Sequence, residues 1–291
     1  MLQTKTSRID LEEYGRLFAG FDYGSVFVSK DYLSCLNEIK NIEVFAIYER
    51  DKPIAIFPLN VIKRGFVRIF LNPPFTPYFN LLFENLSDKE HKRFKYLEII
   101  VKNYMNFLKR RFIYFSVSQS PDIKDVRHFI WNGASVSIKY TYILENTKES
   151  LDSVDRMVKN KKIMEITEEY DFERKYRMLK EAYKNKPPIS LKNYLIFMNS
   201  LKERRMIKSF SNKTASVTFL IDKAGKTVYA YNISGRDTGL LIYSVMKQNL
   251  LGDYPVDFLG ANTRRISQYK SLFNPEIKSY FNIAGFYALF H

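Results

Sequence analysis

Residues 216–232 read SVTFLIDKAGKTVYAYN, two apolar runs separated by a short polar turn. The runs are rich in β-branched and aromatic residues, which favour strands, and the turn between them contains charged residues and a glycine. We therefore predict an antiparallel hairpin with strands at 216–221 and 227–232.

The first half of the chain has the same layout. Residues 43–57 read EVFAIYERDKPIAIF, which predicts a second hairpin of the same kind. An apolar strand is then expected in each half, at 112–116 after a basic helix end and at 256–260 after the helical stretch 240–250.

Both halves also finish alike. A short helical segment ends near Trp131 in the first half and near Phe273 in the second, and β-rich tails follow at 135–144 and 277–290. The same order of hairpin, helix, strand, short helix and closing strands, occurring twice, indicates an internal repeat.

The polar, charge-rich segment 146–162 separates the repeats. We therefore expect two domains, residues 1–150 and residues 151–291, which agrees with the usual length of a domain. Each is expected to be an α/β domain, with a mixed β-sheet flanked by helices.

The second domain is expected to begin with two helices. Phe172, Tyr176, Leu179 and Tyr183 lie at helical spacing, with Asp171 placed to favour the helix N-terminus. Pro187 and Pro188 stop this helix, and Ser190 has the position of an N-cap for a second helix at 191–201.

Several chemistries lack the residues they need. The single cysteine, Cys35, is expected to be a small core residue, and the three histidines show no zinc-ligand spacing, so we expect no metal site. No Gly-x-Ser-x-Gly or Walker-type loop is present. No window is apolar enough to span a membrane and the start does not resemble a signal peptide, so we expect a cytoplasmic protein.

The formal net charge is +15, and the second half carries the larger share of it. Phosphates of an acyl carrier, a tRNA backbone or an anionic lipid surface would each match this charge, and so would a basic surface without a partner. Basic residues in two groups contribute to this charge: Lys202, Arg204, Arg205 and Lys208, with Lys159, Lys161 and Lys162. These side chains either contact RNA or nucleotide phosphates, or they form a solvated helix face.

The C-terminal segment contains VDFLGAN at 256–262, ISQYKSLFNPE at 266–276 and then Tyr280. An Asp-Phe followed by Gly, an aromatic-Lys pair, and a Phe and an acidic residue before an aromatic strand occur here in order. This order resembles the closing signature of the FemABX-like acyltransferases of the GNAT superfamily.

The resemblance extends over nearly the whole chain. AIFPL at 55–59 and NPPFTPYF at 72–79 are similar to a stretch of the N-terminal domain of that family, and Gly133-Ala134 with YTYIL at 140–144 is similar to its exit strand. The resemblance implies two tandem GNAT-like domains, of which the second is catalytic.

Three ionisable residues are candidates for catalysis, and the resemblance implies the role of the first. It places Lys270 near the carbonyl under attack, where an ammonium would stabilise the developing oxyanion, while a surface lysine is the alternative. Asp257 lies in an apolar strand, where burial would raise its pKa and make it a base for the amine, or it caps the turn that follows. Glu276 is the other candidate base.

The segment 234–240 joins the second hairpin to a helix, where GNAT proteins direct backbone amides at the carrier's pyrophosphate. This implies acyl-CoA as co-substrate, and a turn that caps the helix is the alternative. The residues expected to bind it are Ser234, Gly235, Arg236, Gly239 and Asn262.

The segment 69–83 has no charge and contains three prolines, which exclude a regular helix. It either walls the cleft for the acceptor or packs as an ordinary crossover loop. Aromatic residues from both halves are expected to bind the acceptor: Phe75, Tyr78, Tyr231 and Tyr269.

These observations lead to one hypothesis and two alternatives. The hypothesis is an N-acyltransferase that moves an acyl group from acyl-CoA to an amine of a sugar, an amino acid or a cell-envelope precursor. The first alternative is an aminoacyl-tRNA-dependent enzyme of peptidoglycan synthesis, and the second is a non-catalytic module that binds RNA or glycan on the same fold.

Overall fold

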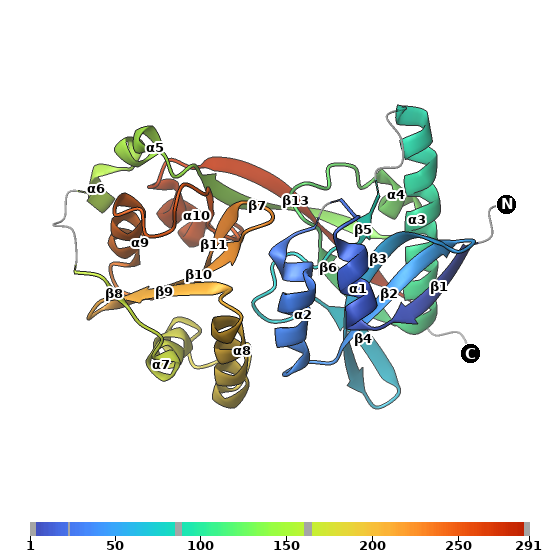
Figure 1. Cartoon of the computed structure of the whole chain (residues 1–291), viewed down its shortest axis with the longest axis horizontal. Helices are drawn as coiled ribbons and strands as arrows, with labels where there is room; N and C mark the ends of the chain where they lie inside the picture. The colour runs from blue at the N-terminus through green and yellow to red at the C-terminus, as the bar shows by residue number, and fades with distance from the viewer. Residues whose placement is uncertain (1–3, 23, 85–88, 160–164, 288–291) are drawn as a thin grey trace. The chain divides into compact units, whose positions relative to one another are not determined.

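The computed structural model describes residues 4–22, 24–84, 89–159 and 165–287. The chain forms two compact units, one made of Met1–Ile138 with Tyr280–His291 and the other of Lys139–Ser279. Figure 1 follows the chain by colour from β1 to β13.

The sheet of the first unit has the strand order β1-β2-β3-β4-β6-β13, and β5 pairs with β3. Its strands are antiparallel apart from β4 and β6, which are parallel. Its elements are β1 (Thr4–Ile9), α1 (Leu11–Phe18), the 3₁₀ turn η1 (Val26–Val28), α2 (Lys30–Asn37), β2 (Ile42–Glu49), β3 (Lys52–Arg64), β4 (Val67–Leu71), β5 (Leu82–Phe83), α3 (Glu90–Arg111), β6 (Tyr114–Ser118), α4 (Arg127–Trp131) and the end of β13 (Glu276–Phe286).

Helix α3 covers one face of this sheet because its apolar residues recur every four positions. Ile100, Tyr104 and Leu108 are fully buried on it, and the Tyr104 ring meets Phe57 of β3 edge to face, with 4.9 Å between centroids. Cys35 is buried in α2, as its apolar neighbours predict.

The sheet of the second unit has the order β7-β12-β11-β10-β9-β8, and only β11 and β12 pair in parallel. Helices α7 and α8 lie on one face and α9 on the other (Figure 1). Its elements are β7 (Ser135–Leu144), α5 (Lys148–Ser153), α6 (Arg156–Lys159), β8 (Thr167–Glu168), α7 (Phe172–Ala182), α8 (Leu191–Glu203), β9 (Ile207–Ser211), β10 (Ala215–Asp222), β11 (Thr227–Gly235), α9 (Thr238–Lys247), β12 (Val256–Asp257) and α10 (Arg264–Ser271).

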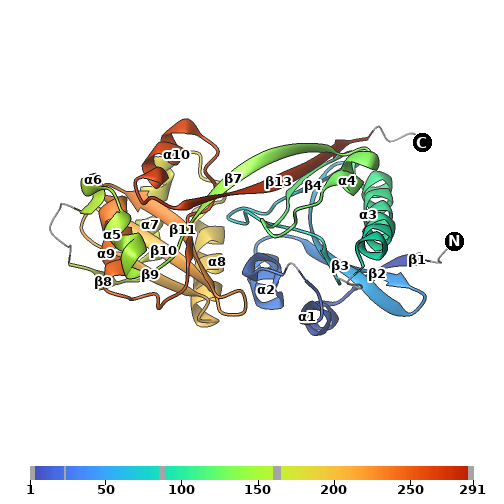
Figure 2. The same ribbon diagram turned by 90° about the horizontal axis from the view of Figure 1, so that it is seen from above.

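Each unit takes its closing strand from the other half of the chain. The end of β7 pairs with β12 in the second unit, through Ile143 and Leu144, while β13 pairs with β6 in the first unit over residues 282–286. Figure 2 shows β7 and β13 as the two long strands that leave their own halves. The units therefore divide at 138/139 and 279/280, where the sequence suggested one division at residue 150.

The local predictions from sequence agree with these elements. Both hairpins are present as β2–β3 and β10–β11, and Asp171 and Ser190 cap α7 and α8 by accepting hydrogen bonds from Arg174 N and Asn193 N. The expected strand 256–260 is shorter than predicted, because β12 contains only Val256 and Asp257. Lys161, Lys162 and the last residues of the expected tail, 288–290, lie outside the described residues.

The described residues contain neither a candidate membrane span nor a candidate metal cluster. No helix in 4–22, 24–84, 89–159 or 165–287 is both long and apolar enough to cross a bilayer. No group of three or more His, Cys, Asp or Glu side chains in these same ranges is arranged to hold a metal ion.

Candidate functional site

The second unit opens where β11 and β12 separate. The two strands pair only through Val228↔Val256 and Tyr229↔Asp257, so the ladder ends early in β11. On its other side, β11 changes register against β10, since Thr218 faces Asn232 and Phe219 faces Ala230, which leaves Tyr231 as the extra residue of a bulge. The rest of β11 thus borders a gap in the ladder that leads toward α9.

A sharp turn joins β11 to α9. Gly235 has φ +97° and Asp237 has φ +55°, both in the left-handed region. Gly235 is required here because a Cβ would come within 3 Å of Thr214 O, Met178 Cε and Ala215 Cα. The turn therefore places the start of α9 directly behind the end of β11.

The N-terminus of α9 has no side-chain cap. The Asp237 side chain accepts no hydrogen bond from the first turn, and that turn contains no acidic residue. Amides of an uncapped first turn and the helix dipole both favour an anion at this position. Arg236 is exposed beside the turn and makes no ion pair with a described carboxylate.

Tyr269 of α10 meets this helix end. Its hydroxyl lies 2.9 Å from Thr238 Oγ1, and a Cβ on Gly239 would meet it at 3.3 Å. Burial raises the pKa of Tyr269 to about 12, so the hydroxyl keeps its proton at neutral pH. Thr238, Gly239 and Tyr269 together form a small polar cluster with an available hydrogen-bond donor.

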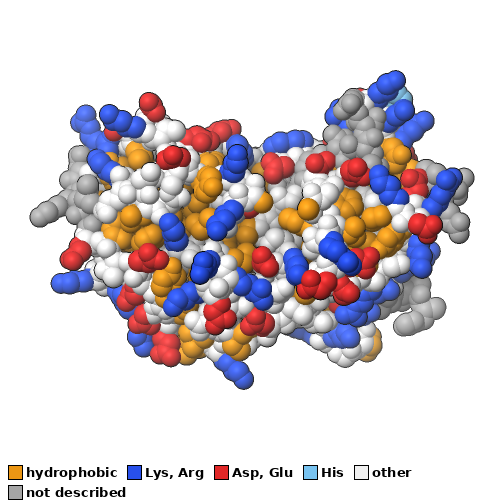
Figure 3. Space-filling view, viewed as in Figure 1, with side chains coloured by type: hydrophobic (Ala, Val, Ile, Leu, Met, Phe, Trp, Pro, Cys, Tyr) orange, Lys and Arg blue, Asp and Glu red, His pale blue; other side chains and the backbone are white. Residues whose placement is uncertain are grey.

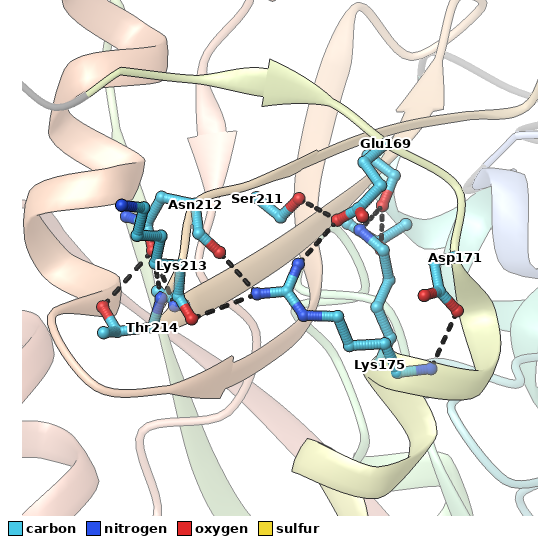
Figure 4. A network of polar contacts seen from close by, with 11 residues as sticks. Glu169, Asp171, Lys175, Ser211, Asn212, Lys213 and Thr214 are labelled. Carbon is cyan, nitrogen blue, oxygen red and sulfur yellow. Dashed lines mark hydrogen bonds and ion pairs between the residues drawn. The ribbon is translucent and has the colours of Figure 1, made fainter.

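A network of polar contacts holds the turn in place (Figure 4). Arg174 donates to Glu169 Oε2 at 2.9 Å and to the carbonyls of Asn212 and Lys213 at 2.6 and 3.2 Å. Ser211 Oγ donates to the same carboxylate.

This network reaches the α9 turn through one backbone bond. Asn212 Oδ1 accepts from Thr214 N at 2.8 Å, which shapes the β9–β10 turn, and the Thr214 carbonyl accepts from Arg236 N at 2.8 Å. Arg174 and Glu169 thus fix the surface on which the candidate anion-binding turn rests. Sequence reasoning missed both residues, because the Glu169 carboxylate pairs with Arg174 and Ser211 and two of the Arg174 partners are backbone carbonyls.

A buried polar row crosses the sheet beneath this site. Lys175 Nζ donates to Ser209 Oγ at 2.7 Å, and Ser209 Oγ lies 2.7 Å from Thr218 Oγ1. Asn232, which faces Thr218 in the ladder, donates to the Tyr194 hydroxyl at 2.7 Å. Burial lowers the pKa of Lys175 to about 8, with Glu169 opposing the shift. Lys175 lies in the apolar stripe of α7 beside Tyr176. A lysine at an apolar position of an amphipathic helix is the sequence signal that indicates a buried amine.

The buried amine predicts a pH dependence of stability. An unfolded lysine titrates near 10.5, so between about pH 8 and that value the unfolded chain binds more protons, and the free energy of unfolding rises with pH. We expect Lys175→Met to reduce the rise seen in urea titrations from about pH 7 to 9.5, below tyrosine ionisation, without lowering stability at pH 7. Lys180→Met, exposed on the same helix, should leave the rise unchanged. An equal rise in wild type and Lys175→Met would show that the amine does not titrate as its burial implies.

Lys270 is buried on α10 and its ammonium is fully occupied. Nζ donates to the carbonyls of Phe258 and Gly260 at 2.6 and 2.7 Å, and to that of Leu259. Burial lowers its pKa to about 8, and the charge of Asp257 opposes the shift. In this arrangement, Lys270 holds together the backbone that follows β12.

The two candidate bases differ in their surroundings. Asp257 lies close to Lys270, whereas Glu276 is exposed. The Asp257 carboxylate is buried and accepts hydrogen bonds from Thr141 Oγ1 and from Leu259 N at 2.7 Å, which is the turn-capping geometry considered from the sequence. The Glu276 carboxylate is exposed at the start of β13, 3.8 Å from Lys278 Nζ.

The other predicted binding residues are distributed between the units. Asn262 Oδ1 accepts from Tyr140 N at 2.8 Å and so joins its loop to β7, while Tyr231 is buried at the bulge of β11. Tyr78 and Phe75 belong to the first unit. The Tyr78 ring packs against Phe27 and Tyr280, and the Phe75 carbonyl accepts from Tyr32.

The first unit fills the position that is open in the second. Its β4 and β6 pair in parallel over residues 69–71 and 114–116, after which Asn72 Oδ1 accepts from Ser118 N at 3.0 Å and Phe79 N donates to Ser118 O. Asn72 also donates to the carbonyls of Thr76 and Pro77. The proline-rich segment therefore continues the contacts between β4 and β6 in the first unit, whereas the β11–β12 ladder of the second unit ends after two pairs.

Comparison with known proteins identifies the fold. Neither a protein-family model nor a curated protein matches the sequence. Among solved structures, FemX superposes with a TM-score of 0.64 and 10% identity over 95% of this chain and 96% of that one. The tandem GNAT protein from the clavulanic acid biosynthesis pathway gives 0.63 and 6% over 99% and 100%, and a putative acetyltransferase from Pyrococcus horikoshii gives 0.51 and 9% over 99% and 91%.

These likenesses cover nearly the whole chain and both units. They agree with the mixed α/β architecture described above. The fold of this protein is therefore the tandem GNAT fold, which it shares with FemX.

Proposed function

We propose that the protein transfers an acyl or aminoacyl group to an amine, with the donor held by the second unit. The observation that carries the proposal is the gap between β11 and β12, which leads to the uncapped N-terminus of α9 beside Tyr269. A donor phosphate would contact the first-turn amides of α9 and Arg236, and its acyl group would lie beside β11, where its ladder with β12 has ended.

The reaction follows from these positions. The amine nitrogen attacks the acyl carbonyl, forming the new C–N bond, and the oxyanion accepts hydrogen bonds from backbone amides of β11 near the bulge. Asp257 or Glu276 accepts the proton that the amine loses. When the bond to the leaving group breaks, Tyr269 donates its proton to the departing sulfur or oxygen, since burial keeps that hydroxyl protonated at neutral pH.

We assign Lys270 a positioning role, because its ammonium binds backbone carbonyls. Its three carbonyl partners fix residues 258–260 at the rim of the gap, so it positions the loop that borders the acyl group. A direct role at the oxyanion would require the ammonium to leave one of these carbonyls.

Two classes of donor fit this site. The FemABX resemblance and the superposition on FemX support an aminoacyl group carried by tRNA, while the likeness to the tandem GNAT protein supports a CoA thioester. Both donors present phosphates to a basic unit. With either donor, we infer an amine of a cell-envelope precursor, amino acid or sugar as acceptor, and a cytoplasmic reaction.

Arg236 provides the test of the donor site. Loss of one charge-assisted hydrogen bond to a phosphate should weaken donor binding about tenfold, with a smaller change in kcat. We expect Arg236→Ala to raise the Kd of the donor that binds, measured by calorimetry with acetyl-CoA, longer acyl-CoAs and aminoacyl-tRNA. Lys223→Ala, exposed in the turn at the opposite end of β11, is the matched control and should bind as wild type does.

The experiment also separates the proposal from a non-catalytic module. Equal affinities in wild type and Arg236→Ala would remove the α9 turn as the donor site. Binding of uncharged RNA alone, with no preference for an acylated donor, would favour the binding module on the same fold.

A further inference from the structure

The sheet of the first unit carries an apolar row that is partly exposed. Ile62, Ile69, Tyr114 and Phe286 face one another across β3, β4, β6 and β13, so their side chains lie on one face. The adjacent row on the opposite face, with Phe70 and Phe115, is fully buried. Phe286 is 75% exposed and Tyr114 is 36% exposed, so this row ends in one largely exposed and one partly exposed aromatic side chain.

The same strands end in an apolar tip. The β3–β4 hairpin turns at Gly65, which has φ +60° and no atom within 4 Å of where a Cβ would be. Phe66 follows it and is 89% exposed, the highest value among the large hydrophobic residues that are described. Figure 1 shows this hairpin extending beyond the neighbouring strands.

The tip is also strongly basic. Lys63 and Arg64 are exposed beside Phe66, and no described carboxylate forms an ion pair with either of them. Across the hairpin, Lys63 faces Arg68, a like-charge pair that is unfavourable without an anion. The sequence contains no Asp or Glu from 52 to 83, so the positive charge has no local counter-charge.

We propose that this surface, defined as Phe66, Tyr114 and Phe286 with Lys63 and Arg64 and called the hairpin surface below, docks the protein on an anionic lipid bilayer. Aromatic side chains enter the interfacial layer, and lysine and arginine beside them remain at the headgroup level. Each cation at an anionic surface increases binding about fivefold, and a buried phenylalanine adds about tenfold or more. The binding is therefore weak, reversible and sensitive to salt.

Two other partners fit this surface less well. RNA binding depends on many phosphate contacts along a groove, and a convex tip with two free cations offers few of them. A symmetric dimer through the hairpin surface would bring the Lys63 and Arg64 side chains of two copies together, which like charges oppose. The proposal does not depend on acyl transfer, because none of these residues belongs to the second unit.

Co-sedimentation with vesicles tests the proposal. We expect the full chain to bind vesicles of phosphatidylglycerol and phosphatidylcholine at a ratio of about 1:2, to bind pure phosphatidylcholine vesicles much less, and to be released at about 1 M salt. Phe66→Glu should reduce binding about tenfold or more. Leu191→Glu is the matched control. Leu191 is 41% exposed at the start of α8, where the helix dipole favours a negative charge. The Leu191→Glu variant should bind the vesicles as wild type does.

A fluorescence measurement locates the contact. Trp131 is the only tryptophan, so Trp131→Phe with Phe66→Trp places a single probe at the tip. Its emission should shift to shorter wavelength on adding the anionic vesicles, while a probe from Leu191→Trp in the same background should not shift. Vesicle binding that is equal in wild type and Phe66→Glu, an unshifted tip probe, or binding of RNA without binding of vesicles would each overturn the proposal.

Discussion

Replacing Gly235 by alanine is expected to lower the free energy of unfolding by about 3 kcal/mol and to abolish donor binding. The residue has φ +97°, which costs an L-residue about 1–2 kcal/mol, and its Cβ would overlap the Thr214 carbonyl and Met178. Because Thr214 O also accepts from Arg236 N, relief of the overlap must displace the turn before α9. Urea denaturation and donor calorimetry measure the two effects.

Gly252 offers a control for this variant. It also has positive φ, at +73°, but nothing lies within 4 Å of where its Cβ would be. Gly252→Ala should therefore cost about 1 kcal/mol from backbone strain alone and leave donor binding intact. Equal losses in the two variants would mean that the packing of Gly235 against the β9–β10 turn is not important.

Replacing Lys270 by methionine is expected to destabilise the protein by about 3 kcal/mol or more. The change removes one ammonium and leaves three carbonyls, of Phe258, Leu259 and Gly260, without their donor, and it also removes the positive charge beside the buried Asp257. Chemical denaturation at pH 7 checks the magnitude.

Lys208→Met is the matched control for this loss. Its Nζ donates to a single carbonyl, that of Leu250, at 2.7 Å, and the side chain is exposed, so the variant should lose less than about 1 kcal/mol. A Lys270→Met protein with wild-type stability and a large loss of kcat would contradict the positioning role and support direct stabilisation of the oxyanion.

The sequence predicts local structure correctly where the residue types and their spacing both indicate the same element. The hairpins at β2–β3 and β10–β11 follow from alternating apolar runs, and the caps of α7 and α8 follow from Asp171 and Ser190, because these features involve neighbouring residues. The two-domain GNAT-like architecture followed from the repeat and the family resemblance.

The exchange of closing strands could not be predicted in this way. Residues 135–144 and 277–286 have the same apolar and aromatic character, and either could complete either sheet by local criteria. Pairing of Leu144 with Val256, and of Ala284 with Ser116, depends on tertiary packing over long sequence separations.

The candidate site was only partly accessible to sequence reasoning for a related reason. The segment 234–240 was recognised by its position between strand and helix, and the structure adds the gap beside β11 and the contact of Tyr269 with Thr238. The partners of Lys270 and Arg174 are mainly backbone carbonyls, whose positions depend on φ and ψ and leave no pattern in side-chain identity.

We propose above that the second unit uses a donor bound at α9 to acylate an amine. The most direct test is to incubate the purified chain with isotopically labelled acetyl-CoA, longer acyl-CoAs or aminoacyl-tRNA and a panel of amino acids, amino sugars and cell-envelope precursors, and to detect amides by mass spectrometry. We expect a labelled amide from one donor class, formed only when the protein is present. No labelled amide from either donor class with any amine, despite a folded protein, would contradict it.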